Sequence, residues 1–230
     1  RPDGGSLATT ADGGAAVALP LVGSPYGSSS AQCPSGPDCA LTPFMVLDGG
    51  AGNYFSNGSI VASVAGSFSF AVVFSKDNLA SRGQLINLGG TGQGTLQSEV
   101  FTNAKILVNV YSSSDSNTQF TSAASVVPNV VHVLVFTYEK VGAGTSVMRL
   151  YFDGVADTPI TNAVSIRSSD QQTFVGLRNP ANGEIPFAGH IYGAAVTGLL
   201  LTPTQALELS NVMQGTNAGN WGQALTTSAW

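Results

Sequence analysis

Carboxylates are the first side chains to test for chemistry, and here they are isolated. The four glutamates are Glu99, Glu139, Glu184 and Glu208, and no two of them alternate along one predicted strand. Glycoside hydrolysis needs two carboxyl groups roughly 5 to 10 Å apart. No G-x-S-x-G motif is present to supply an activated serine. The sequence therefore predicts no enzymatic activity, and a polysaccharide-cleaving enzyme that joins distant carboxylates is only the third hypothesis.

Asp48 and Asn53 form the best candidate cation site. They flank a Gly-rich turn, and carboxylate and amide oxygens are the ligands that Ca²⁺ prefers. The competing interpretation is that the Asp48 side chain caps the Gly49-Gly50 turn. Calcium is therefore a possible cofactor, and the sequence indicates no other.

Two cysteines, Cys33 and Cys39, enclose a five-residue segment. Two cysteines cannot complete a zinc site, and neither histidine lies near them in sequence. A small disulfide loop is the favoured interpretation, with a stabilising effect of about 2 kcal/mol in the chain-entropy model. Such a bond indicates an oxidising location, outside a cell or on a particle surface.

Aromatic rings are candidate platforms for sugar stacking. Tyr111, Tyr54 and Trp221 are the proposed ligand-binding residues, although each ring is also compatible with a place in the core. Tyr111 comes just before a run of serines, and we expect it to be the most exposed of the three. The sequence Asn57-Gly58-Ser59 fits the N-glycosylation pattern and suits a surface loop.

Two histidines and one aspartate have structural interpretations. His132 and His190 fall inside strand patterns, where we expect half-buried, hydrogen-bonded rings. Asp153, followed by Gly154, is typical of a tight hairpin turn, and nearby Asp157 adds only a weak indication of metal binding.

Composition excludes several classes of partner. Only 9% of the 230 residues are charged, against about 25% in an ordinary soluble domain, and the net charge is −5. The eight Lys and Arg residues are scattered, so neither nucleic acid nor an anionic membrane is an expected partner. No apolar run reaches the roughly 20 residues of a bilayer span. The first residue, Arg1, indicates a processed product or a fragment.

Short β-strands must position these residues. Residues with period-2 alternation extend from Phe44 onward, for example in 68–74, 106–110, 132–138, 148–152, 173–177 and 187–196. Gly, Asn and Ser separate these segments. The pattern predicts an all-β fold, a two-sheet antiparallel jelly-roll sandwich.

One short C-terminal helix completes the predicted fold. Thr202 is a suitable N-cap, Pro203 suits the first helical position, and Gln205 can close a capping box. We expect this helix to cover an edge or an end of a sheet. Predicted boundaries are a Gly/Ser/Ala-rich arm with the disulfide loop over 1–43, the jelly-roll domain over 44–214 and a tail over 215–230.

The order of these motifs resembles a known family. The segments 44–50 with 53–55, 131–138 with 149–155, and 187–192 with 201–203 are similar to the opening strand, central hairpin and closing strand of laminin-G-like domains. These domains belong to the concanavalin A-like lectin/glucanase superfamily. The resemblance implies a two-sheet jelly roll that binds glycans or proteins, in some members through calcium.

Two main hypotheses for function follow. The first is a non-catalytic, extracellular, lectin-like recognition module that binds a glycan or a surface protein. The alternative is an assembly subunit of a surface filament, viral shell or fibre, with the N-terminal arm contacting copies of the same chain. Both place the protein in an extracellular or surface-exposed location, without nucleic acid and without membrane insertion.

Overall fold

The computed structural model describes most of the chain between residues 45 and 215. Its described residues are 8–9, 17–18, 21–22, 45–49, 54–57, 66–89, 95–112, 114, 116–142, 145–166, 173–178, 184–198 and 200–215. Cys33, Cys39, Asn53 and Trp221 lie outside these ranges. Among the residues described, no helix is long and apolar enough to cross a membrane.

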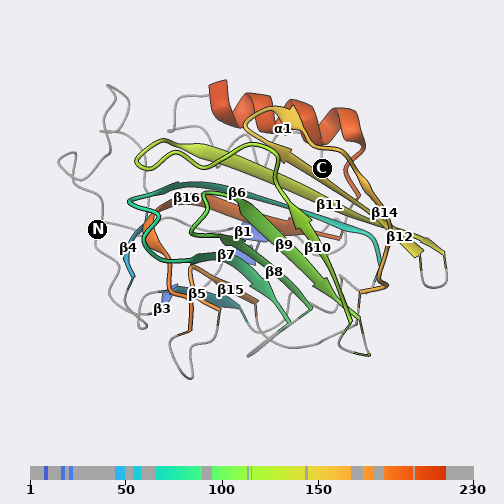
Figure 1. Cartoon of the computed structure of the whole chain (residues 1–230), viewed down its shortest axis with the longest axis horizontal. Coiled ribbons are helices and arrows are strands. Elements are labelled where there is room, and N and C mark those ends of the chain that lie inside the picture. The colour runs from blue at the N-terminus through green and yellow to red at the C-terminus, as the bar shows by residue number, and fades with distance from the viewer. Residues whose placement is uncertain are drawn as a thin grey trace.

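Two antiparallel sheets pack face to face, as predicted (Figure 1). The helix-side sheet has the strand order β13-β12-β11-β6-β16-β4, with β14 also paired to β12. Its strands are β4 (Met45–Asp48), β6 (Phe68–Lys76), β11 (His132–Gly142), β12 (Thr145–Phe152), β13 (Val155–Ala156), β14 (Ile160–Ala163) and β16 (Ala188–Thr197).

The opposite sheet has the order β10-β9-β8-β7-β15-β5-β3. Its strands are β3 (Leu21–Val22), β5 (Tyr54–Asn57), β7 (Gly83–Leu88), β8 (Leu96–Val100), β9 (Ile106–Tyr111), β10 (Asn117–Thr121) and β15 (Thr173–Val175). Two further short strands, β1 (Ala8–Thr9) and β2 (Val17–Ala18), pair with each other.

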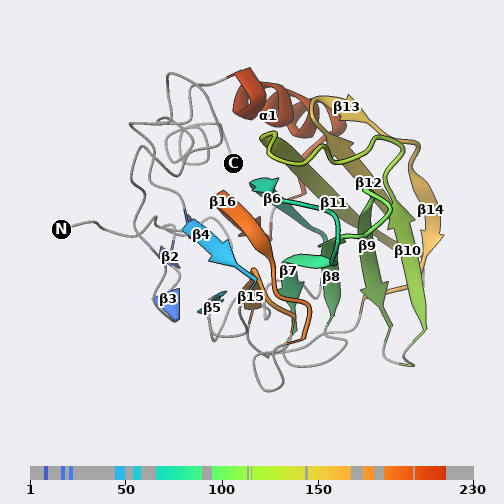
Figure 2. The same cartoon turned by 60° about the vertical axis from the view of Figure 1, so that its left-hand side comes forward.

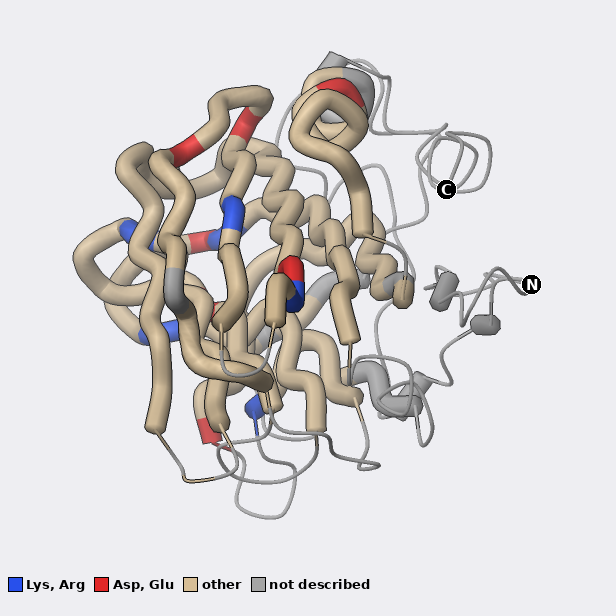
Figure 3. Tube along the Cα trace, turned by 90° about the vertical axis from the view of Figure 1, so that its right-hand side faces the viewer, with Lys and Arg blue, Asp and Glu red and all other residues tan. Residues whose placement is uncertain are grey.

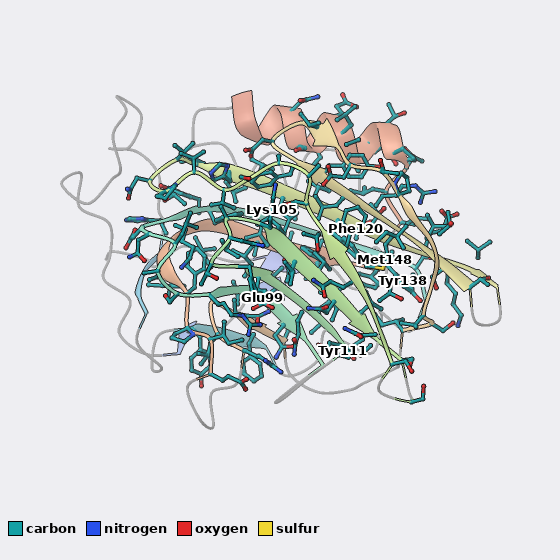
Figure 4. The ribbon with its side chains drawn as sticks, in the orientation of Figure 1. Glu99, Lys105, Tyr111, Phe120, Tyr138 and Met148 are labelled. Carbon is teal, nitrogen blue, oxygen red and sulfur yellow. The ribbon has the colours of Figure 1, made fainter. Side chains whose placement is uncertain are left out.

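The main core lies between the sheets. Alternate residues of each strand point into it, and these are the apolar ones: Phe68, Phe70 and Phe74 of β6 are fully buried there. Phe120, Tyr138 and Met148, which come from both sheets, belong to the same core (Figure 4). The predicted period-2 alternation is thus the pattern that builds the sandwich.

Helix α1 (Pro203–Gly215) covers the outer face of the helix-side sheet (Figures 1 and 2). Leu201, Ala206 and Leu209 pack there against Val133 and Val135 of β11. Our expectation that the helix covers an edge or an end of a sheet was therefore wrong. Ala71 and Val73 of β6, on the same outer face as Val133 and Val135, are apolar too, so this part of the sheet needs a cover on its second face.

The predicted capping box at the start of α1 is confirmed. The Gln205 backbone N–H donates to Thr202 Oγ1 at 3.3 Å, and the Thr202 backbone N–H donates to Gln205 Oε1 at 3.0 Å. The two side chains thus satisfy each other's backbone donors.

The predicted turn at Asp153 is also confirmed. Asp153 and Gly154 have φ values of 51° and 76°, which suit a tight turn between strands. The Val133 backbone N–H donates to Asp153 Oδ1 at 2.8 Å, so the carboxylate also fixes the neighbouring strand.

Candidate functional site

Four amide side chains form a row across the opposite sheet. Gln119 of β10 is the cross-strand partner of Asn109 of β9, Asn109 is the partner of Gln97 of β8, and Gln97 is the partner of Asn87 of β7. We call these four residues the amide row. Directly paired residues of antiparallel strands project to the same face, so the four side chains are neighbours.

The amide row lies on the outer face of the sheet. The residues on either side of it along each strand, such as Leu96 of β8, Val108 of β9 and Phe120 of β10, belong to the core between the sheets. Successive side chains of a strand point to opposite faces, so the amides point away from the core. Sequence alternation of amides with apolar residues is the local cause of this arrangement.

Exposure increases along the row toward β10. Gln97 is 2% exposed and Asn109 is 7% exposed, whereas Gln119 is an exposed residue. Asn87 is 0% exposed, so three of the four amides are buried and only Gln119, at the β10 end of the row, is accessible.

Hydrogen bonds hold the amides in place. The Tyr111 hydroxyl donates to Gln97 Oε1 at 3.3 Å, and Asn117 Nδ2 donates to Asn109 Oδ1 at 3.3 Å. Asn87 Nδ2 donates to the Arg178 carbonyl at 2.6 Å. The row is thus preorganised by its neighbours on the same face.

An ion pair borders the row. Arg82 donates to both carboxylate oxygens of Glu99, from Nε at 2.8 Å and from Nη2 at 2.6 Å. Its guanidinium carbon also lies 4.7 Å from the centre of the Phe101 ring. Glu99 is on β8, two residues from Gln97, and therefore shares the outer face; Figure 4 labels it together with Tyr111.

Aromatic rings lie at the end of the amide row next to β15. Phe174 of β15 pairs with Asn87 and so continues the row. The Tyr54 and Phe174 rings meet edge to face, with centroids 5.7 Å apart and planes at 72°.

The face offers hydrogen-bonding groups with little net charge. The exposed amide of Gln119 supplies both donors and an acceptor, which suits a ligand rich in hydroxyl groups. Of the charged side chains described beside the row, Arg82 pairs with Glu99, and Arg178 pairs with Glu184 at 2.9 Å. Charged positions are few along the described part of the trace (Figure 3).

The structure brings two of the three predicted ligand-binding rings onto this sheet. Tyr54 is half-buried and contacts Phe174. Tyr111 is only 8% exposed, so our expectation of an exposed ring was wrong: its hydroxyl is used to orient Gln97. Trp221, the third ring, lies outside the described residues, and ligand binding by any of them stays a prediction.

Asp48, one of the two predicted calcium residues, lies in the other sheet. Asp48 is the last residue of β4, in the helix-side sheet, where its partner is Ala188. Its side chain and Asn53 are outside what the structure describes, so a site for the ion stays a prediction. Within the described ranges, no three His, Cys, Asp or Glu residues cluster as metal ligands would.

Two other predicted features fall partly on described residues. Asn57 is the last residue of β5 and pairs with Thr173, so it occupies a strand end rather than the surface loop that we expected. Its side chain is not described, and glycosylation stays a prediction. The predicted disulfide between Cys33 and Cys39 falls wholly outside the described residues and stays a prediction.

Both histidines are buried and hydrogen-bonded. His132, 3% exposed, places Nδ1 2.6 Å from Asp153 Oδ2, while its Nε2 accepts from the Val127 N–H at 2.9 Å. The rings are hydrogen-bonded as expected, but they are more deeply buried than the predicted half-buried state.

The surroundings of His190 resemble a catalytic arrangement only in composition. Ser75 Oγ and Asp77 Oδ1 lie 3.4 and 3.7 Å from its Nδ1. A proton relay needs the serine and the aspartate on different ring nitrogens, so this geometry does not activate Ser75.

Sequence reasoning did not find the amide row. Its members lie on four strands, and only their cross-strand register makes them neighbours. The available signal was the alternation of Gln and Asn with apolar residues in 96–100, 106–111 and 117–121. A strand was predicted only in the second of these segments, at 106–110.

Comparisons with known proteins agree with this architecture. Residues 47–206 match a family model described as the concanavalin A-like lectin/glucanases superfamily. No curated protein sequence matches the chain significantly.

Similar solved structures share the fold at low sequence identity. The sialidase carbohydrate-binding module CBM40 of Ruminococcus gnavus, bound to α2,3-sialyllactose, is 12% identical with a TM-score of 0.54, over 65% of this chain and 86% of that one. The binding domain of botulinum neurotoxin serotype G is 12% identical with a TM-score of 0.61, over 90% of this chain and 50% of that one.

A third structure is the binding domain of botulinum neurotoxin DC in complex with SialylT. It is 13% identical with a TM-score of 0.58, over 86% of this chain and 46% of that one. The chain thus spans about half the length of these neurotoxin domains.

Proposed function

The chain belongs to the laminin-G-like domains of the concanavalin A-like lectin/glucanase superfamily, and from this membership we propose that it is a non-catalytic, extracellular recognition module that binds a glycan at the amide row. The observation that carries the proposal is the alignment of Asn87, Gln97, Asn109 and Gln119 on one outer face. Gln119, the exposed amide of the row, can donate to and accept from the hydroxyl groups of a sugar.

The charges beside the row favour a neutral glycan. CBM40 of R. gnavus is described with sialyllactose, whose carboxylate needs a cationic partner. In this chain the described guanidiniums beside the row already pair with Glu99 and Glu184. We therefore propose a neutral, hydroxyl-rich polysaccharide as the ligand.

The positions of the glutamates support a role without catalysis. Glu99, Glu139 and Glu184 each form an ion pair with an arginine, at 2.6, 2.7 and 2.9 Å. Each of these carboxylates is thus already engaged by a guanidinium within the protein.

A glycan array with neutral and sialylated members tests this function, followed by titration calorimetry of the best ligand. We expect Gln119→Ala to weaken binding by about tenfold, the equivalent of about 1.4 kcal/mol. Asn211→Ala, which removes an exposed amide from α1 on the other side of the molecule, is the matched control and should not change the affinity.

Repeating the titration with calcium and with a chelator tests Asp48 and Asn53. Loss of binding after chelation would support the calcium site that we propose there. Absence of binding to every glycan, with and without calcium, would contradict the function.

A further inference from the structure

Strand β10 forms an edge of the opposite sheet and pairs only with β9. Two hydrogen bonds show which of its residues face β9. The Ser112 N–H donates to the Ser116 carbonyl at 2.8 Å, and the Ser122 N–H donates to the Ile106 carbonyl at 2.9 Å. Because bonded and non-bonded residues alternate in an antiparallel pair, Ser116, Thr118, Phe120 and Ser122 use their backbone groups toward β9.

The backbone groups of Asn117, Gln119 and Thr121 therefore point away from the sheet. Within the described chain these three residues make no backbone hydrogen bond beyond the sheet. Their side chains are also exposed. The edge thus presents three residues, each with a free N–H donor and a free C=O acceptor.

Natural sheets protect such edges with short strands, bulges, prolines or charges. The neighbouring edge of the helix-side sheet has these devices: β13 has two residues, and β14 follows Pro159 and pairs with β12 through a register shift. The β10 sequence, Asn-Thr-Gln-Phe-Thr, contains no charge, no proline and no glycine, and its register with β9 is regular.

We propose that two copies of this chain associate through their β10 edges, antiparallel, around a twofold axis at Gln119. In this register Gln119 pairs with Gln119 of the second copy, and Asn117 pairs with Thr121 of the second copy. All three outward-facing residues then occupy hydrogen-bonded positions, which gives about six interchain hydrogen bonds.

The edge is complementary to itself in this arrangement. A twofold interface presents the same patch on both subunits, so a charged centre would face its own charge. Gln119 is neutral and amphoteric in hydrogen bonding, so a copy of itself is an acceptable partner. The two sheets become continuous, and the amide rows of both copies join end to end.

Sedimentation velocity of the full chain over a range of concentrations tests this proposal. The wild-type chain should show a monomer–dimer equilibrium. Gln119→Lys and Gln119→Glu should each raise the dissociation constant by about tenfold or more, because like charges would lie directly opposite each other at the axis. Asn211→Lys, with the same charge change on α1, should leave it unchanged.

Mixing the two Gln119 variants gives the sharper result. A lysine opposite a glutamate should restore a heterodimer at concentrations where each variant alone is monomeric. A wild-type chain that stays monomeric throughout, or a dimer that survives both single variants, would overturn the proposal. No glycan is present in these measurements, so their failure is distinguishable from failure of the proposed function.

Discussion

The outer faces of the two sheets are both formed by alternate residues of β-strands, but the residues that point outward differ in chemistry. On the helix-side sheet, the outward residues of β11 are Val133 and Val135, and α1 covers them. On the opposite sheet, the outward residues of β9 include Asn109 and Tyr111. We call this outer face, which carries the amide row, the amide face. These outward residues are thus apolar and packed under a helix on one sheet, and polar and hydrogen-bonded within the sheet on the other.

The covered face contributes stability, because apolar side chains are removed from water there. Leu201 and Leu209 are 6% and 5% exposed, and full burial of such a side chain stabilises by about 2 kcal/mol. The amide face contributes less, since a hydrogen bond within the protein largely replaces one to water. Its value is in the fixed positions of its polar groups.

The largest difference between the faces should appear when a charge is placed on each. Val135→Asp puts an unpaired carboxylate under α1 and should lower the free energy of unfolding by about 4 kcal/mol or more. Gln119→Asp puts the same carboxylate on the exposed end of the amide row and should change it by less than about 0.5 kcal/mol. Urea denaturation measures both, and equal losses would contradict the contrast.

A smaller difference in stability should separate the Arg82–Glu99 ion pair from the Arg149–Glu139 ion pair. Glu99→Gln removes the charge from a side chain that is 1% exposed and leaves Arg82, 38% exposed, without its partner. We expect a loss of about 1 to 2 kcal/mol, below that of a fully buried pair because water screens Arg82. Glu139→Gln, in the more accessible pair with Arg149, should cost less than about 0.5 kcal/mol in the same denaturation experiment. A larger loss from Glu139→Gln than from Glu99→Gln would show that the ion pair on the amide face is not the more stabilising of the two.

Removal of the helix cap should affect the covered face alone. Thr202→Ala leaves a backbone N–H of α1 without its acceptor and should cost about 1 kcal/mol. Thr204→Ala, at the second residue of α1, is the control and should be nearly neutral. Glycan affinity, measured by calorimetry, should be the same in both variants. A change in affinity would show that the two faces are coupled through the core.

The smallest expected effect comes from the interior that both faces share. Lys76 is fully buried, its Nζ has no hydrogen-bond partner in the described structure, and it lies 5.3 Å from the Phe187 ring. Burial lowers the pKa of Lys76 below its ordinary value of 10.5, although Asp77 opposes this. Lys76→Met should stabilise by less than about 1 kcal/mol, because the lost contact with the ring offsets part of the gain.

The pH dependence distinguishes this cause from a packing effect. Between the lowered pKa and 10.5, the unfolded chain binds more protons at Lys76 than the folded chain does. The free energy of unfolding should therefore rise with pH in this window, and Lys76→Met should remove the slope. Burial raises the pKa of Tyr151 and Tyr192 above 10.0, which opposes the trend only at higher pH. Denaturation below pH 10.0 thus tests Lys76 apart from these two tyrosines.

Much of the sandwich was predictable because its longest strands alternate strongly. The patterns around Phe68, His132, Met148 and Phe187 correspond to β6, β11, β12 and β16, and Thr202 with Gln205 marks the start of α1. The position of α1 was not predictable, since it depends on which sheet face is left apolar after folding.

The amide row was less accessible to sequence reasoning. Strands β7, β8 and β10 were not predicted, because their polar alternate residues also suit loops. The register that aligns Gln97 with Asn109 depends on pairing between separate segments. Tyr111 was chosen for an open surface, but its hydroxyl bonds to Gln97 and the ring is buried with it.

The amide row crosses the strands instead of following one of them. The spacing of its Cα atoms is consequently set by the distance between paired strands, roughly 4.8 Å. Because Asn87, Gln97 and Asn109 are buried, only the β10 end of this regular array is open to the solvent. A glycan would therefore meet the row at that end rather than along its length.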